Sequence, residues 1–351
     1  MSDTTLSERI HAIRQSMGQD LCILGHHYQS DAVIRHCDYT GDSLELAQMI
    51  PHIQASNIVF CGVSFMGESA QLLTKKEQKV YLPDPHAHCM MALMASGCHV
   101  RSVLNALQKE HKNILPLAYV NTSVGLKAVV GAFGGSVCTS ANAQTMLAWA
   151  LEASDCVLFL PDKHLAVNTA QKLGLTEHDW EILRLSGDGL ATPLSSLRKK
   201  KLLIWPGLCP LHGMITRDHI TKARSTVQNC RILVHPECPP SIVAQSDGAG
   251  STSYIIRETQ KAFEASSSTP LVIGTEANLV ARLAKRFGHK FPISPLFQAY
   301  CPDMNAVTEE KLLNLLQRLQ KGQAEALELL PEECEPAKAA LERMLRIVAK
   351  K

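Results

Sequence analysis

The sequence predicts an α/β protein made of three pseudo-repeated small α/β units, each with a parallel sheet, arranged about a pseudo-threefold axis around a central cavity. Short apolar runs alternate with helix-like segments. Three stretches of the chain align with one another in spacing, and three cysteines close these copies at equivalent places. At 351 residues the chain also exceeds the roughly 100–200 residues of a usual domain.

We expect the units to span residues 1–112, 113–229 and 230–351, with the C-terminal helices in the last unit. Each unit begins with a short strand-like apolar run that is followed by a polar pair. These openings read "LCILGHHYQSD", "ILPLAYVNTS" and "RILVHPECPP". Their polar pairs are His26 with Tyr28, Tyr119 with Asn121, and His235 with Glu237.

A hydroxyl residue follows each pair at the entrance to a helix, where we expect it to be the N-cap. Ser43 and Thr252 stand 17 residues after the histidine of their copy, and Ser140 stands 21 residues after Tyr119. Helix N-termini that converge would offer N–H groups to a small anion. A second apolar run and helix keep the register, because Met66, Lys163 and Glu276 follow the three hydroxyl residues by 23, 23 and 24 residues. We interpret Lys163 and Glu276 as structural residues.

Cys89, Cys209 and Cys301 close the copies 46, 69 and 49 residues after the hydroxyl residues. The middle spacing is long because of an insert at 175–200, which is polar and is predicted to be a surface excursion. Each of the three cysteines follows a short apolar segment and precedes a helix. This pattern predicts loops at the carboxyl ends of strands, where ligands of parallel sheets gather.

The other cysteines carry weaker signals. The chain has 12 cysteines, and in a reducing compartment they are expected to be free thiols. Cys22, Cys61, Cys138 and Cys156 lie in or beside apolar runs and are predicted to be core residues. The sequence has no C-x-x-C pair, which disfavours a zinc ribbon or a locally bound ferredoxin-type cluster.

Composition excludes several classes of partner. A formal net charge of +2 provides no field for nucleic acid, and no apolar stretch approaches the roughly 18 residues of a membrane span. The first residues, "MSDTTLSERI", are polar and lack the apolar region of a signal peptide. We therefore expect a cytoplasmic protein that binds neither nucleic acid nor membrane.

Three convergent thiolates suit zinc or a four-iron cluster. With zinc, His212 or His88 could be the fourth ligand and the site would be structural. With a four-iron cluster, one iron would lack a protein ligand and could act as a Lewis acid. The polar groups beside the cysteines favour catalysis, since a structural zinc site does not need them.

The chain resembles the quinolinate synthase family of iron–sulfur enzymes in NAD biosynthesis. The resemblance covers roughly residues 20–350 and is carried by "GHHYQSD", "GDSLELA", "VSFMGESA", "YVNTS", "CTSANA", "PDKHLA", "WPGLCPLH", "HPECPP", "GSTSYII", "IGTEANL" and "CPDMN", in the family's order. It implies condensation of iminoaspartate with dihydroxyacetone phosphate to quinolinate, with release of phosphate and two waters. It also implies an aspartate oxidase or dehydrogenase as the supplier of the imine.

The resemblance further implies one [4Fe-4S] cluster per chain, held by Cys89, Cys209 and Cys301. Glu237 and Tyr119 are our candidates for acid–base catalysis, and His26 for steering the triose carbonyl. The residues expected around the substrates are His26, Ser43, Tyr119, Asn121, Ser140, His212, His235, Glu237 and Thr252. Two other functions compete with this one: a zinc-stapled protein that binds a small dicarboxylate or phosphate, and a cofactor-free aldolase with Lys163 as Schiff-base nucleophile.

Overall fold

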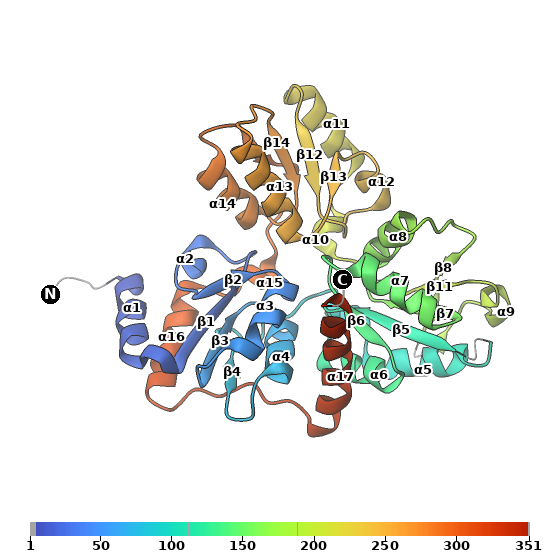
Figure 1. Ribbon diagram of the computed structural model, residues 1–351, viewed down its shortest axis with the longest axis horizontal. Coiled ribbons are helices and arrows are strands. Elements are labelled where there is room, and N and C mark those ends of the chain that lie inside the picture. The colour runs from blue at the N-terminus through green and yellow to red at the C-terminus, as the bar shows by residue number, and fades with distance from the viewer. Residues whose placement is uncertain (1–4, 111–112, 188, 350–351) are drawn as a thin grey trace.

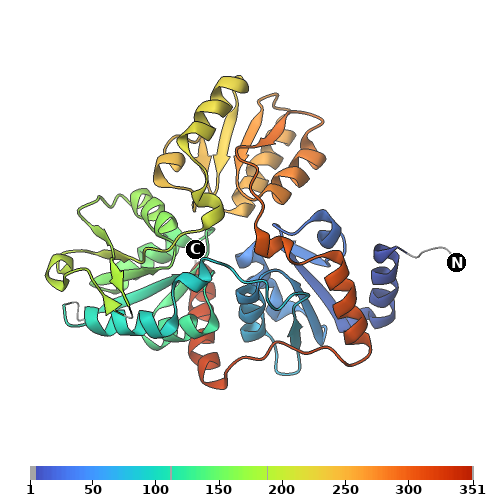
Figure 2. The same cartoon turned by 180° about the vertical axis from the view of Figure 1, so that it is seen from behind.

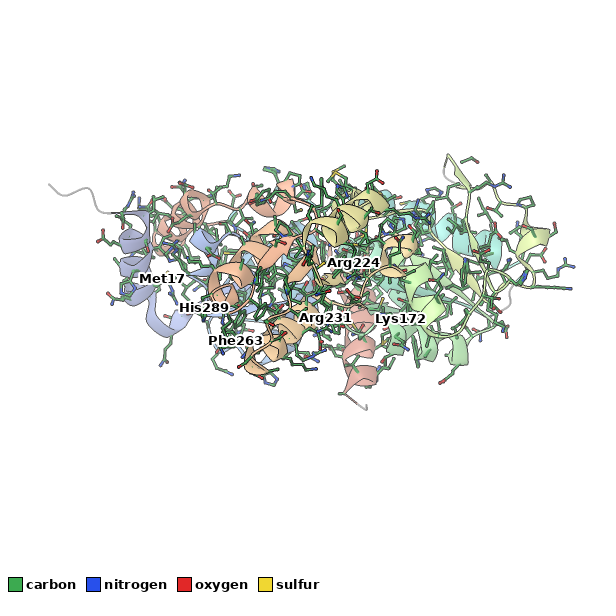
Figure 3. All side chains as sticks on the ribbon, turned by 90° about the horizontal axis from the view of Figure 1, so that it is seen from above. Met17, Lys172, Arg224, Arg231, Phe263 and His289 are labelled. Atoms are coloured by element: carbon green, nitrogen blue, oxygen red, sulfur yellow. The ribbon has the colours of Figure 1, made fainter. Side chains whose placement is uncertain are left out.

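The computed structural model describes residues 5–110, 113–187 and 189–349. It is an α/β structure whose three main sheets lie in three lobes around a common centre (Figure 1). Seen edge-on, the three lobes form a single flat layer (Figure 3). The expected boundary at residue 112 falls on a residue outside the described part of the chain.

The three sheets repeat one topology. If the strands of each sheet are numbered along the chain, the first and third sheets have the order second, first, third, fourth, and the second sheet has the same order, β6-β5-β7-β11, when β8 of the insert is set aside; all strands of the three sheets are parallel. The order reverses between the first and third strands, which is where parallel sheets open a crevice at their carboxyl ends. The predicted repeat of small α/β units is confirmed at the level of the sheets.

The first sheet has the order β2-β1-β3-β4. The run at 21–26 is buried at every position, as expected for a parallel strand covered on both faces. The elements of this region are α1 (Leu6–Met17), η1 (Gly18–Asp20), β1 (Leu21–His26), α2 (Asp31–Ile34), β2 (Tyr39–Gly41), α3 (Ser43–Met49), η2 (Ile50–His52), β3 (Asn57–Cys61), α4 (Ser64–Leu73), β4 (Lys79–Tyr81) and η3 (Ala92–Met94).

The second sheet has the order β6-β5-β7-β11-β8, so its fifth strand is an addition to the shared pattern. Its elements are α5 (Gly97–Leu107), β5 (Ile114–Tyr119), α6 (Val124–Ala132), β6 (Ser136–Cys138), α7 (Ala143–Ala153), β7 (Cys156–Leu160), α8 (Lys163–Lys172), β8 (Trp180–Ile182), β9 (Leu185–Ser186), β10 (Gly189–Leu190), α9 (Leu194–Leu197) and β11 (Leu202–Ile204).

The 175–200 insert is less of a surface excursion than the sequence predicts. Its strand β8 pairs with β11 and extends the main sheet at one edge. Trp180, Leu183 and Leu197 are buried there, because their apolar side chains find core contacts that outweigh the polar composition of the segment. The short strands β9 and β10 pair with each other, outside the main sheet, and β10 packs against α5.

The third sheet has the order β13-β12-β14-β15. Unlike the first two units, which share one continuous apolar core, the third unit has two separate cores, one on each face of its sheet. Its elements are α10 (Pro210–Gly213), α11 (Arg217–Thr226), β12 (Arg231–Val234), α12 (Pro240–Val243), β13 (Gly248–Ala249), α13 (Thr252–Glu264), β14 (Leu271–Gly274), α14 (Ala277–Phe287) and β15 (Ile293–Pro295).

The chain after the third sheet returns to the other two units through α15 (Pro302–Asn305), α16 (Glu309–Gln320) and α17 (Pro331–Val348). Helix α16 packs on α1, while α17 packs on α6 and β6, as the red ribbon shows from behind (Figure 2). A Cβ atom at Gly131 would lie 1.8 Å from the carbonyl oxygen of Pro336, so the contact between α6 and α17 requires glycine. The C-terminal helices thus cover the first and second units.

Candidate functional site

The carboxyl edges of all three sheets face one cavity of about 140 Å³. At about 30 Å³ for each water in the liquid, this volume corresponds to roughly five water molecules. The structure brings every residue predicted for the site to its wall: His26, Ser43, Cys89, Tyr119, Asn121, Ser140, Cys209, His212, His235, Glu237, Thr252 and Cys301. Their roles as ligands and catalytic groups stay predictions.

The three hydroxyl residues are not N-caps, so that prediction is wrong. Ser43 and Thr252 are the first residues of α3 and α13, and the capping side chains are those of Asp42 and Ser251. The Asp42 carboxylate accepts from two backbone N–H groups, and a carboxylate is the stronger acceptor for this task. The serine and threonine hydroxyls are therefore free to line the cavity.

Three cysteine thiols line the cavity, one after the last shared strand of each sheet. Burial raises the pKa of Cys89 to about 12 and that of Cys301 to about 11, and raises the pKa of Cys209 well above its usual value. Thiolates at these positions therefore need a cation, whose binding would release the thiol protons. All twelve cysteines of the chain are free thiols.

A buried carboxylate organises two imidazoles in the cavity wall. Glu237 Oε2 lies 2.8 Å from His212 Nδ1 and 3.1 Å from His235 Nδ1, and the two rings stack with centroids 4.6 Å apart. Burial alone would raise the pKa of Glu237, but the two histidines hold it well below its usual range. Glu237 is therefore ionised at neutral pH and can accept a hydrogen bond from the Nδ1–H of either ring; the contact of His235 Nδ1 with the backbone N–H of Glu237 is longer, at 3.4 Å.

One of these imidazoles connects the carboxylate to a cavity hydroxyl. His235 Nε2 lies 3.2 Å from Ser140 Oγ, which comes from the second unit. With a proton on Nδ1 directed at Glu237, the His235 ring presents an Nε2 that can accept a proton from Ser140. The sequence Glu237–His235–Ser140 is thus a carboxylate–imidazole–hydroxyl relay that ends at the cavity.

The other imidazole belongs to a longer chain of hydrogen bonds. His212 Nε2 lies 3.1 Å from Thr275 Oγ1, whose oxygen is 2.8 Å from the hydroxyl of Tyr28. Thr252 donates to the same Tyr28 hydroxyl at 3.3 Å. This series of hydrogen bonds connects side chains of the first and third units to His212. His212 lies in α10, at the start of the segment that leads from the second sheet to the third.

Tyr28 and Thr275 are site residues that are not among those expected around the substrates, although Tyr28 is named in the first polar pair. Tyr28 belongs to the polar pair after β1 and lines the cavity. Thr275 follows β14 and is fully buried. The position of Tyr28 in that pair was a usable signal, whereas nothing local distinguishes Thr275 from other strand-end threonines.

His26 and Tyr119 are held in their neutral forms. Burial lowers the pKa of His26 to about 3, and its Nδ1 accepts from the backbone N–H of Tyr28 at 3.2 Å, which leaves the ring proton on Nε2. Burial and the charge of Glu237 raise the pKa of Tyr119 well above its usual value. Both side chains can therefore donate a proton or hydrogen bond to a substrate oxygen.

The cavity offers donors for both of the competing metals. Cys209 Sγ, His212 and the Glu237 carboxylate place one ligand atom each within 4.8 Å of one another, a mixed set that zinc accepts. Two further thiols on the same cavity, Cys89 and Cys301, make the site richer in sulfur, which suits an iron–sulfur group. His88 is exposed and bonds Ser64 instead of facing the cavity.

Lys163 does not belong to this cavity. It is the first residue of α8 and lines a separate surface depression together with Trp180 and Pro240. The side chain of Glu276 is the N-cap of α14, as the structural interpretation of that residue predicted. Within the described part of the chain, no helix is long and apolar enough to cross a membrane.

Comparison with known proteins identifies relatives over almost the whole chain. The family described as Quinolinate synthetase A protein matches residues 8–346. Proteins named quinolinate synthase from Acidobacterium capsulatum and Streptomyces coelicolor are 37% and 39% identical, each over 99% of this chain and over 94% and 89% of their own lengths. A protein of the same name from Nocardioides is 42% identical over 99% of this chain and 91% of its own.

Proposed function

The chain belongs to the quinolinate synthetase A family, enzymes of NAD biosynthesis, and from this premise we propose that it condenses iminoaspartate with dihydroxyacetone phosphate. The products are quinolinate, one phosphate and two waters, which balance the atoms of the two substrates. One observation carries the proposal: three thiols, two carboxylate-linked imidazoles and several hydroxyls from three different sheets line a single cavity.

We assign Cys89, Cys209 and Cys301 as the protein ligands of one [4Fe-4S] cluster. Three soft thiol donors on one wall fit this group, and three ligands leave one iron open. When bound, the cluster supplies a Lewis acid that polarises a substrate oxygen and assists loss of water. Removal of the cluster should therefore abolish activity without unfolding the three sheets.

The anionic groups of the substrates need hydrogen-bond donors that are fixed in advance. Ser43, Ser140 and Thr252 offer hydroxyls, and Asn121 adds an amide whose Nδ2 can donate. His26 offers its Nε2 proton to the triose carbonyl, because its Nδ1 is already occupied. These groups orient the two substrates for carbon–carbon bond formation.

The shifted pKa values of Glu237 and Tyr119 indicate how protons are transferred in the site. The strongly lowered pKa of Glu237 makes it an anchor for positive charge on the imidazoles, so we assign its acid–base role to action through His235 and His212. His235 takes a proton at Nε2 while Glu237 stabilises the resulting imidazolium. Tyr119 keeps its proton and serves as the acid that protonates a leaving hydroxyl.

The test is anaerobic purification followed by iron and acid-labile sulfide analysis and a quinolinate assay with both substrates. About four irons per chain with product supports the proposal. Iron without product would retain the cluster and refute the substrates. Stoichiometric zinc without product would favour the zinc-stapled binding protein, for which the close set of Cys209, His212 and Glu237 is the favouring observation.

A further inference from the structure

The three cysteine loops are attached to the sheets by one repeated hydrogen bond. In each unit, the first residue of the helix after the third strand donates its backbone N–H to a carbonyl oxygen two residues before the cysteine. The distance is 2.8 Å in all three cases: Ser64 to Ala87, Lys163 to Gly207, and Ala277 to Ala299. The N-cap residue of each helix therefore lies beside a cysteine loop.

In the second unit this N-cap is Asp162, whose side chain does two tasks. One carboxylate oxygen accepts from the backbone N–H of Leu165 at 2.6 Å and so caps α8. The other accepts from the backbone N–H of Cys209 at 2.9 Å. Asp162 is fully buried and also forms a bridge with Gly207, so the strand-end loop and the cysteine loop meet at this residue.

In the third unit the equivalent N-cap is Glu276, which is also fully buried. Its Oε2 accepts from the backbone N–H groups of Asn278 and Leu279 at 2.8 and 3.3 Å. Burial raises the pKa of Glu276 to about 7, and neighbouring backbone N–H groups, that of Cys301 among them, act in the opposite direction. The other oxygen, Oε1, is buried and has no hydrogen-bond partner among the described residues, so Glu276 acts on the loop of Cys301 through the helix that it caps, whose first residue holds Ala299.

The first unit departs from this pattern. Its N-cap is Val63, whose apolar side chain cannot accept a hydrogen bond. The hydroxyl of the adjacent Ser64 lies 3.0 Å from His88 Nδ1. Cys89 therefore has no carboxylate at the equivalent place. The repeat thus supplies a backbone attachment to all three cysteine loops and a carboxylate to two of them.

We propose that Asp162 and Glu276 are positioning residues that hold Cys209 and Cys301 in the geometry required by the iron–sulfur group. Asp162 accepts a hydrogen bond from the amide of Cys209, and Glu276 caps the helix whose first residue holds the loop of Cys301, so each fixes the backbone from which a thiol projects. Such outer contacts of metal ligands typically change metal affinity about 10–100-fold when they are removed. This inference rests on the proposed function, since it concerns how the cluster is held.

The experiment compares the rate of cluster loss among variants. Asp162→Asn keeps the size of the side chain, but its amide nitrogen must face one of the two N–H groups, and Glu276→Gln makes the matched change in the third unit. Thr5→Ala is the control, because it removes an N-cap hydrogen bond from α1, far from any cysteine loop. Each protein is reconstituted anaerobically, its iron and sulfide are measured, and decay of its visible absorption is followed in excess chelator.

We expect Asp162→Asn and Glu276→Gln to lose the cluster about 10–100 times faster than the unsubstituted protein. Thr5→Ala should stay within about twofold of the unsubstituted protein in this rate, even though loss of its cap lowers the melting temperature of its apoprotein. A structural role alone would lower the apoprotein melting temperature of all three variants without changing the relative rates of cluster loss.

The two proposals fail in different ways. If the unsubstituted protein takes up no iron, both the proposed function and this inference are wrong. If it holds about four irons but the Asp162→Asn and Glu276→Gln proteins lose them no faster than Thr5→Ala, only the positioning role is refuted. Should one of the two carboxylate variants fail to fold, the other gives the answer, because each acts on a different cysteine loop.

Discussion

Replacement of Glu237 by glutamine tests the centre of the proposed mechanism. The carboxylate accepts hydrogen bonds from His212 and His235 through the same oxygen, at 2.8 and 3.1 Å. Glutamine has almost the same shape and can keep one oxygen at this place. It removes the negative charge that stabilises a proton arriving on either ring.

The size of the effect follows from these contacts. A hydrogen bond to a charged group contributes about 1.5–3 kcal/mol and a neutral one about 0.5–1.5 kcal/mol, so two bonds weaken by about 2–3 kcal/mol in total. The amide avoids the burial of a charge, which offsets part of this loss in the folded state. In the transition state there is no such offset, and a loss of about 2–3 kcal/mol corresponds to a fall in kcat of about 30- to 160-fold.

The assay is anaerobic quinolinate formation, normalised to iron content and accompanied by chemical denaturation of the apoprotein. Glu258→Gln is the control, because this carboxylate pairs with Arg231 and Lys261 in the third unit and does not line the cavity. It should leave kcat unchanged. If Glu237→Gln retains full iron and a kcat within tenfold of the unsubstituted enzyme, the relay through the imidazoles is wrong.

Three other predictions concern ligands, charge and unit contacts. Cys89→Ser should lower bound iron to less than half, while the exposed Cys98→Ser keeps it; equal iron in both would refute the ligand assignment. Burial lowers the pKa of Lys127 from 10.5 to about 8, so between these pH values the unfolded chain binds a proton that the folded chain does not. The free energy of unfolding should therefore rise with pH by about 3 kcal/mol relative to Lys127→Met, in denaturation curves at pH 7.5 and about 10.5; parallel pH profiles would contradict this. Tyr28→Phe removes two hydrogen bonds between units and should lower the free energy of unfolding by about 1–2 kcal/mol, whereas Tyr39→Phe, at an exposed position, should have no effect.

The periodic parts of the fold were predictable because their causes are local. Continuous apolar runs such as 21–24 and 156–160 identify buried parallel strands, and the four cysteines assigned to apolar runs are all buried. The helix caps were harder to place. Asp42 and Ser251 directly precede Ser43 and Thr252, which the sequence predicts as N-caps. Only the hydrogen bonds show which of the two neighbours accepts from the backbone N–H groups of the helix.

The insert shows the opposite case. Residues 175–200 look polar and solvated in sequence, yet β8 joins the main sheet and buries Trp180. Three-residue strands carry too little periodicity to be recognised, and pairing with β11 is a contact that depends on the rest of the sheet. For the same reason the return of α16 and α17 to the first and second units could not be inferred from their amphipathic pattern.

The sequence by itself determined that the chain forms three α/β units with parallel sheets. It also determined which residues of the three units are equivalent and which residues follow their strands. Strand runs, polar pairs and cysteine spacings are properties of neighbouring residues, so they can be seen without coordinates. Only the tertiary structure decided that Glu237 joins His212 and His235, that Tyr28 bonds Thr275, and that Asp162 holds the amide of Cys209. Apart from the contact between the near neighbours His235 and Glu237, these contacts join residues that are distant in sequence, and they form because packing brings the carboxyl ends of the strands to one cavity.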